Sequence, residues 1–117
     1  MHELSITQSM VDVVKRELSK QSNSLHIKKV TVQIGKLTGV VPDCVRFYFS
    51  FLIQGTVLEG AQLEIKEVPV RLFCNQCDNN FVLDEVNFVC PRCGKSDLKM
   101  NSGRELFVES IETEEHG

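Results

Sequence analysis

Apolar residues near the amino terminus recur at intervals of three and four positions, which is the spacing of one face of a helix. This pattern predicts an amphipathic helix over residues 4–20. Ser5 followed by Gln8 fits a capping box, although a helix that begins one turn earlier fits the sequence as well. The apolar stripe consists of Leu4, Val11, Val14 and Leu18, widened by Ile6, Met10 and Val13.

Strict alternation of apolar and polar residues follows in "VTVQI", so we expect residues 30–34 to form a strand with one buried face. Residues 35–39 are expected to form a loop, Pro42 suits the first position of a second helix, and Gly55 ends that helix. The second helix is rich in aromatic residues but has only one basic residue, Arg46. A surface that stacks bases needs more basic residues, so we expect the aromatic residues to pack in the core. They are Phe47, Tyr48, Phe49 and Phe51.

A second strand is predicted over residues 62–73, but its alternation changes phase between Ile65 and Val68. A bulge or an edge strand near Pro69 would account for this change. An open strand edge there would also allow a homodimer to form by strand exchange. The stretch "ELFVESI" predicts a third strand over residues 105–111, and we expect the acidic tail of residues 112–117 to be frayed.

Four of the five cysteines form two C-x-x-C pairs, Cys74 with Cys77 and Cys90 with Cys93. Each tight turn directs two thiolates to one ion, and two such turns supply the four sulfurs of a tetrahedral structural Zn(II) site. Redox-active dithiols or an iron–sulfur cluster would use the same residue type. Cys44 stands apart, and we expect it to be a half-buried core thiol near a helix start; the alternative is a redox or metal-binding role.

The cysteine pairs lie between two predicted strands, so the segment that carries them is expected to be an insertion. We therefore predict an α+β fold, with a small three-stranded sheet, two helices and an inserted four-cysteine zinc-ribbon module. Residues 1–73 and 103–117 would form the α/β domain, and residues 74–102 would form the zinc-ribbon domain.

The charge of the chain argues against nucleic acid and membrane partners. The net charge is −3, and the segment from Cys74 to Gly103 has four acidic and three basic residues before Zn(II) with four thiolates adds about −2. No apolar run approaches the roughly 18 residues of a membrane helix, and the sequence lacks a secretory signal. We expect a cytoplasmic protein in which the thiols stay reduced. We expect no enzymatic activity, because four cysteines fill a zinc site and no catalytic motif is present.

The chain opens with "MHE", which places several nitrogen ligands in one short chelate. They are the terminal amine of Met1, the backbone nitrogen and imidazole of His2, and the backbone nitrogen of Glu3, whose carboxylate adds an oxygen. Planar nitrogen sets of this kind suit Ni(II) or Cu(II). A surface histidine before a helix explains the same residues, with Glu3 well placed at the helix dipole, and spacing alone favours this simpler interpretation.

Several stretches fall together in an order that resembles the HypA/HybF family of hydrogenase maturation proteins. The resemblance covers nearly the whole chain and implies a nickel metallochaperone for the maturation of [NiFe]-hydrogenase, with an α/β nickel domain and a zinc domain. The stretches that carry it are "MHELSI", "VTVQIG", "PDCVRFYF", "CNQC" and "CPRCG".

The resemblance also implies a nickel site and partners. The family builds its nickel site at the N-terminus, which corresponds here to Met1, His2 and Glu3, and an acid at the start of the second helix, here Asp43, would lie near the metal. Ni(II) would be bound transiently and Zn(II) structurally. The implied partners are a HypB-like GTPase and the hydrogenase large subunit or other maturation factors. The alternative is a zinc-ribbon module that binds a protein or nucleic acid and carries no nickel.

Overall fold

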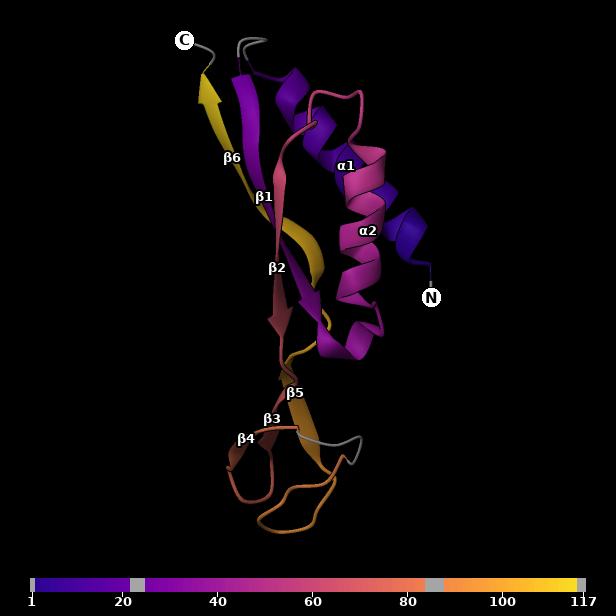
Figure 1. Ribbon diagram of the computed structural model, residues 1–117. Helices are drawn as coiled ribbons and strands as arrows, with labels where there is room; N and C mark the ends of the chain where they lie inside the picture. Colours follow the sequence, from indigo (N-terminus) through magenta and orange to yellow (C-terminus); the bar gives the residue numbers. More distant parts are fainter. Residues whose placement is uncertain (1, 22–24, 84–87, 116–117) are drawn as a thin grey trace.

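The computed structural model describes residues 2–21, 25–83 and 88–115 as two units joined end to end (Figure 1). The molecule is elongated, with extents of 58 × 25 × 17 Å. Its radius of gyration is 18.1 Å, compared with about 13 Å for a compact domain of this length. The elements are α1 (Glu3–Ser19), β1 (Leu25–Gly35), the 3-10 helix η1 (Lys36–Thr38), α2 (Pro42–Leu52), β2 (Gln62–Val68), β3 (Arg71–Cys74), β4 (Asn80–Val82), β5 (Leu98–Ser102) and β6 (Leu106–Glu115).

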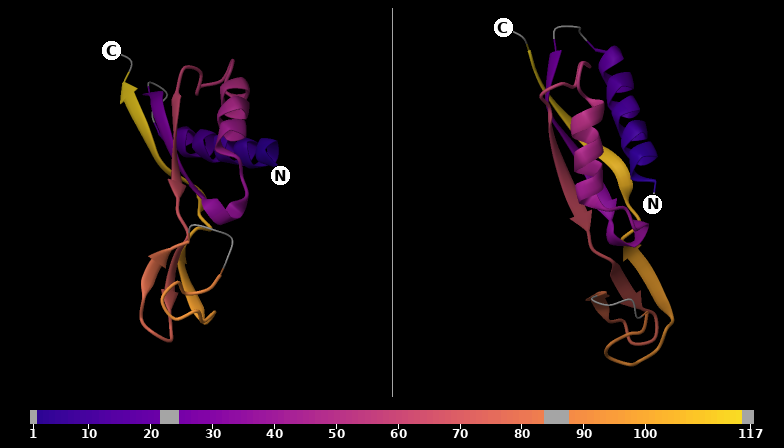
Figure 2. Two further views of the ribbon diagram at one scale, coloured as in Figure 1. Left: turned by 60° about the horizontal axis from the view of Figure 1, so that its bottom comes forward. Right: turned by 45° about the vertical axis from the view of Figure 1, so that its right-hand side comes forward.

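The first unit is a three-stranded sheet in the order β2-β1-β6, with α1 and α2 packed on one face (Figures 1 and 2). β1 is parallel to β2 and antiparallel to β6. Parallel neighbours need a crossover connection, and α2 supplies it between β1 and β2. The predicted α+β class, with two helices on a three-stranded sheet and an inserted four-cysteine module, is confirmed.

The core lies between the helices and the inner face of β1. The predicted strand is confirmed, with Val30, Val32 and Ile34 buried, but Thr31 on the opposite face is buried as well, so the burial does not strictly alternate. Val14 on α1 and Phe49 on α2 are buried in the same core as these strand residues. The predicted core was too wide, because large apolar side chains lie outside it on both helices: Leu4 is 49% exposed, Phe47 66% and Phe51 65%.

The second unit is an antiparallel sheet in the order β4-β3-β5. The sequence predicted one strand over residues 62–73, and this was wrong, because β2 and β3 belong to different sheets. The change of phase marks the point where the chain leaves one sheet, at Pro69, and enters the other. The Pro69 carbonyl accepts a hydrogen bond from the Ser102 hydroxyl at 2.7 Å, which ties the outgoing chain to the end of β5. The predicted domain boundaries at residues 74 and 102 stay a prediction.

At the junction of the two units, the backbone around Gly35 packs directly against the backbone of residues 103–105. The N–H of Gly35 donates to the Glu105 carbonyl at 2.7 Å, and the N–H of Leu37 donates to the Gly103 carbonyl at 2.9 Å. A Cβ on Gly35 would lie 2.2 Å from the Gly103 oxygen, so only glycine permits this approach.

The acidic tail of residues 112–117 was predicted to be frayed, and for residues 112–115 this was wrong, because β6 continues to Glu115; residues 116 and 117 lie outside the described residues. Thr113 and Glu114 pair with Ile27 and His26, because β1 also begins earlier than predicted, at Leu25. Backbone pairing along β1 therefore overrides the polar composition of the tail. Among the described residues, no helix is long and apolar enough to cross a membrane.

Candidate metal sites

The four paired cysteines lie in two turns with matching backbone hydrogen bonds. In the first turn, the N–H of Asp78 donates to the Cys74 carbonyl at 2.9 Å, and in the second the N–H of Gly94 donates to the Cys90 carbonyl at 2.8 Å. Asp78 and Gly94 both have positive φ, 58° and 73°. This left-handed conformation folds the chain back after each cysteine pair, so that both thiols of a turn point inward.

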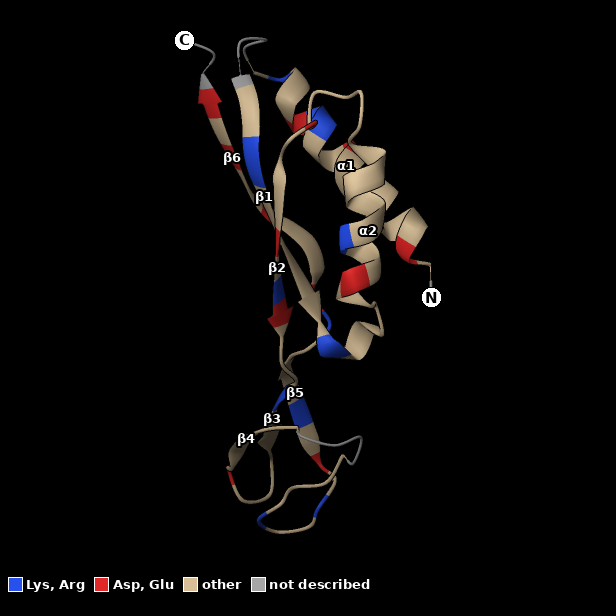
Figure 3. Ribbon diagram, viewed as in Figure 1, with Lys and Arg blue, Asp and Glu red and all other residues tan. Residues whose placement is uncertain are grey.

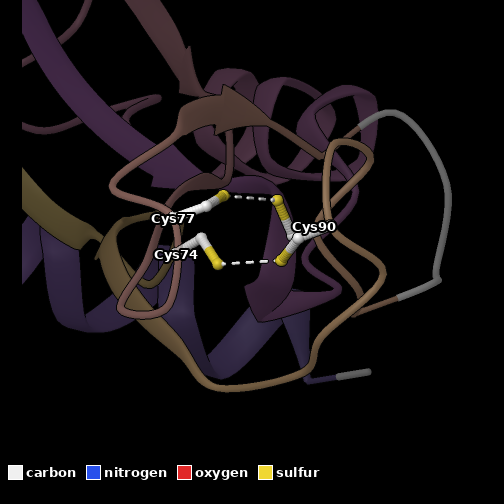
Figure 4. A group of neighbouring side chains, drawn as sticks. Cys74, Cys77 and Cys90 are labelled. Atoms are coloured by element: carbon white, nitrogen blue, oxygen red, sulfur yellow. Dashed lines mark hydrogen bonds between the residues drawn. The ribbon is translucent and has the colours of Figure 1, made fainter.

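The four sulfurs gather into one cluster between the two turns (Figure 4). All four Sγ atoms lie within 4.8 Å of one another, Cys74 Sγ is 3.5 Å from Cys93 Sγ, and Cys77 Sγ is 3.6 Å from Cys90 Sγ. A tetrahedral ion with metal–sulfur bonds of about 2.3 Å would separate its sulfurs by about 3.8 Å. The cluster therefore has the size of a four-sulfur metal site.

The thiols of the cluster differ in acidity. Burial, together with the hydrogen bonds to the neighbouring cysteine thiols, raises the pKa of Cys77 to about 12. Burial also opposes ionisation of Cys90, but the backbone N–H groups of Cys93 and Arg92 and the amide of Asn79 outweigh it and lower the pKa to about 6. A thiolate at Cys90 beside a thiol at Cys77 is a site prepared for a cation, since thiolates are the metal-binding form.

Two polar residues that the sequence did not single out support the cluster. The amide of Asn79 donates to Cys90 Sγ at 3.7 Å. The carboxylate of Asp97 accepts from the side-chain amides of Asn75 and Gln76, both at 3.1 Å, and these two hydrogen bonds lower its pKa. Asp97 thus joins the first cysteine turn to the segment after the second. The sequence signal for this link was that Asn75 and Gln76 lie between Cys74 and Cys77, in the first cysteine turn.

Among the predicted nickel ligands, His2 is exposed and lies at the N-cap position of α1. Met1 lies outside the described residues. Glu3 is buried, with 7% of its surface exposed, and its carboxylate accepts a hydrogen bond from the backbone N–H of Val41 at 3.1 Å. This hydrogen bond is the main reason why the pKa of Glu3 lies below its usual value of 4.5.

Asp43 lies in the first turn of α2 and its carboxylate is paired with Arg46 at 2.9 Å. The acidic residues in the first turns of α1 and α2, Glu3 and Asp43, are red in Figure 3. Of these two residues, Glu3 is linked by a hydrogen bond to the segment that precedes α2, at Val41. Cys44 is half-buried, as predicted, and is not among the four sulfurs of the cluster.

A sheet with two helices, joined to an inserted four-cysteine unit, defines a small α+β protein that carries a four-sulfur metal site. Residues 1–113 match the family model described as "Hydrogenase/urease nickel incorporation, metallochaperone, hypA". The chain therefore belongs to the HypA family of nickel metallochaperones, as the sequence resemblance predicted.

Curated relatives match over nearly their full length. The chain is 44% identical to the hydrogenase maturation factor HypA of Caldanaerobacter subterraneus, over 97% of this chain and 100% of that protein. It is 41% identical to the same factor of Nostoc punctiforme, over 98% and 97% of the two chains. The solution structure of the nickel metallochaperone HypA from Helicobacter pylori has the same fold, with a TM-score of 0.63 at 24% identity and coverage of 99% and 100%.

Proposed function

We propose that this chain carries Ni(II) at its N-terminus, with His2 as the principal ligand, and delivers it during hydrogenase maturation. The observation that carries this proposal is the exposure of His2 at the start of α1 in a chain of the HypA family. An exposed imidazole at that position can reach an ion without moving any core residue. The proposal takes Met1 as the first residue of the protein, so that its amine is a second ligand.

The structure favours a backbone role for Glu3 in nickel binding. Its carboxylate is hydrogen-bonded to the Val41 N–H and is buried, so ligating an ion would break that contact. We therefore assign the backbone nitrogens of His2 and Glu3 to the nickel set, together with the Met1 amine and the His2 imidazole. Asp43 is a weaker candidate, because its carboxylate is already paired with Arg46.

We propose Zn(II) for the four-cysteine cluster. Four sulfur ligands at these separations suit Zn(II), and they leave no open position for a water or substrate, so the ion's role is structural. The ligands would be Cys74, Cys77, Cys90 and Cys93. The hydrogen bond from Asn79 to Cys90 fixes the orientation of one ligand in the way that outer-shell groups commonly do.

Delivery requires that nickel be released as well as bound. Protonation of the His2 imidazole competes with the metal, so nickel binding weakens as the pH falls. The proposed receivers are a HypB-like GTPase and the hydrogenase large subunit or other maturation factors in the cytoplasm. The names of the relatives, hydrogenase maturation factors, support this route.

Metal analysis of untagged protein, followed by a transfer assay, tests the proposed function. Zinc together with exchangeable nickel, and passage of that nickel to a maturation partner, is the expected result. If the protein contains only zinc at every nickel concentration, the result would contradict the proposal and support the alternative, a zinc-ribbon interaction module without nickel delivery.

A further inference from the structure

A groove of about 450 Å³ lies between α1 and the start of β6. Its walls are mainly apolar, and Val13 on α1 and Leu106 on β6 are each 38% exposed. The groove is therefore accessible from solvent, although Met10, which also lines it, belongs to the buried core. Its apolar lining comprises Ile6, Met10, Val13, Leu106, Phe107 and Val108.

The strand that borders this groove has an open edge. Within the described residues, β6 pairs with β1 and with no other strand. The Gly35 N–H donates to the Glu105 carbonyl. Antiparallel hydrogen bonds alternate along a strand, so the next residue, Leu106, turns its N–H and C=O away from β1 and toward the open edge. Such groups are a template for another strand.

The two edges of this sheet are protected to different degrees. The opposite edge strand, β2, carries Glu64, Lys66 and Glu67, and charged residues on an edge discourage pairing. On β6, the three residues Leu106–Val108 carry no charge, and Phe107 is 46% exposed. The unprotected edge and the apolar groove therefore coincide, which is the arrangement of a site for strand addition.

The negative charge of β6 indicates which kind of strand can pair with its open edge. β6 carries four glutamates and no lysine or arginine. Two copies of β6 paired antiparallel about Phe107 would place Glu105 directly opposite Glu109, and like charges in that position destabilise the pair. A second copy is thus a poor occupant, whereas a segment with basic residues is a good one.

We propose that the open edge of β6 at Leu106–Val108 and the adjoining groove bind an extended segment of another protein in which apolar residues alternate with lysine or arginine. Successive side chains of a strand point to opposite faces, so the apolar residues enter the groove against α1. The basic residues lie on the other face, beside Phe107 and the glutamates of β6, of which Glu109 is already paired with Lys66. The groove shares no lining residue with the proposed nickel and zinc ligands, and the inference does not depend on the proposed function.

The test is an NMR titration of the ¹⁵N-labelled, zinc-loaded full chain with the capped peptide Ser-Lys-Val-Lys-Val-Lys-Val-Ser. We expect shift changes confined to β6 and the first three turns of α1. Val13→Asp places a charge in the groove and should weaken binding at least about tenfold. Val57→Asp, at a site 62% exposed between α2 and β2, is the matched control and should bind like the wild type.

Glu112→Lys tests the charge preference separately, because this exposed residue lies outside the groove and the core. It should weaken binding of the lysine peptide severalfold, and a peptide with glutamate in place of lysine should bind the wild type more weakly. Equal binding of the two peptides, or unchanged binding to Val13→Asp, would overturn the proposal. So would concentration-dependent dimerisation of the wild type that Val13→Asp abolishes, because a second copy would then occupy the groove.

Discussion

The carboxylate of Glu3 accepts a hydrogen bond from the backbone N–H of Val41, which lies 38 residues further along the chain. This contact ties the first residue of α1 to the N-cap of α2. It fixes the backbone immediately after His2, so the proposed nickel ligands start from a defined position in the fold. The carboxylate of the "MHE" sequence therefore has a structural role that the sequence did not indicate.

Replacing Glu3 should destabilise the protein in a pH-dependent way. The pKa of Glu3 is lowered, mainly by the Val41 N–H, so the folded state binds this proton less tightly than the unfolded chain does. The stabilisation is thus present above the ordinary pKa of 4.5 and is lost as the pH falls through the lower folded value. Denaturant midpoints of wild type and Glu3→Gln should differ at neutral pH and converge in acid.

Glu3→Ala serves as the second variant, since glutamine keeps an acceptor oxygen for Val41 and alanine does not. Alanine should lower the midpoint more than glutamine at neutral pH. Equal midpoints for wild type and both variants would show that the Val41 contact contributes nothing to folding.

Removing the first cysteine pair should abolish zinc binding and unfold the second sheet. Cys74→Ala combined with Cys77→Ala deletes two of the four proposed ligands, and a small metal-bound unit depends on its ion for folding. Elemental analysis should find one zinc per chain in the wild type and none in this variant. Cys44→Ala is the control and should keep its zinc, because Cys44 is outside the cluster. Full zinc content in the double variant would refute the assignment.

Alanine substitutions of two phenylalanines on α2 test how this helix packs in the core. Phe49 is 4% exposed and Phe47 is 66% exposed. Phe49→Ala should cost about 3–5 kcal/mol, because it leaves a cavity behind the lost side chain. Phe47→Ala should change stability by less than about 0.5 kcal/mol. Denaturant unfolding measures both, and similar losses at the two positions would contradict the packing of α2.

The junction of the two units is tested by Gly35→Ala. The added Cβ would lie 2.2 Å from the Gly103 oxygen and 2.7 Å from the Arg104 nitrogen, and backbone atoms cannot move aside as a flexible side chain can. We expect a loss at or above the upper end of the roughly 1–3 kcal/mol typical of overpacking. Gly60→Ala has nothing within 4 Å and should cost only about 1 kcal/mol for its positive φ. A tolerated Gly35→Ala would mean that the junction is looser than its hydrogen bonds indicate.

Local patterns predicted the elements whose contacts are also local. The alternation in β1 and the proline at the start of α2 identified these elements. The two C-x-x-C pairs identified the sulfur cluster, because each pair is confined to one turn and only the meeting of two turns remained to be inferred.

The features that the sequence did not reveal depend on distant partners. Pairing with residues 25–27 extends β6 as far as Glu115. The predicted alternatives near Pro69 were a bulge or an edge strand; β2 is an edge strand, and the phase change proved to be the switch from its sheet to the other one. Phe47 and Phe51 are apolar but face outward, since hydrophobicity alone does not say which side of a helix meets the sheet. The burial of Glu3 depends on Val41, which sequence spacing could not place beside it.

Calorimetric titration of Ni(II) into untagged wild type, His2→Ala and a form extended by one residue before Met1 tests the nickel site most directly. Loss of an outer-shell group typically costs 10–100-fold in metal affinity, so loss of the His2 imidazole should cost more than about 100-fold. The extended form should also bind weakly, because its amine becomes an amide. Zinc content and the unfolding midpoint should stay unchanged in both. Equal nickel affinity in all three proteins would contradict a nickel site at Met1, His2 and Glu3.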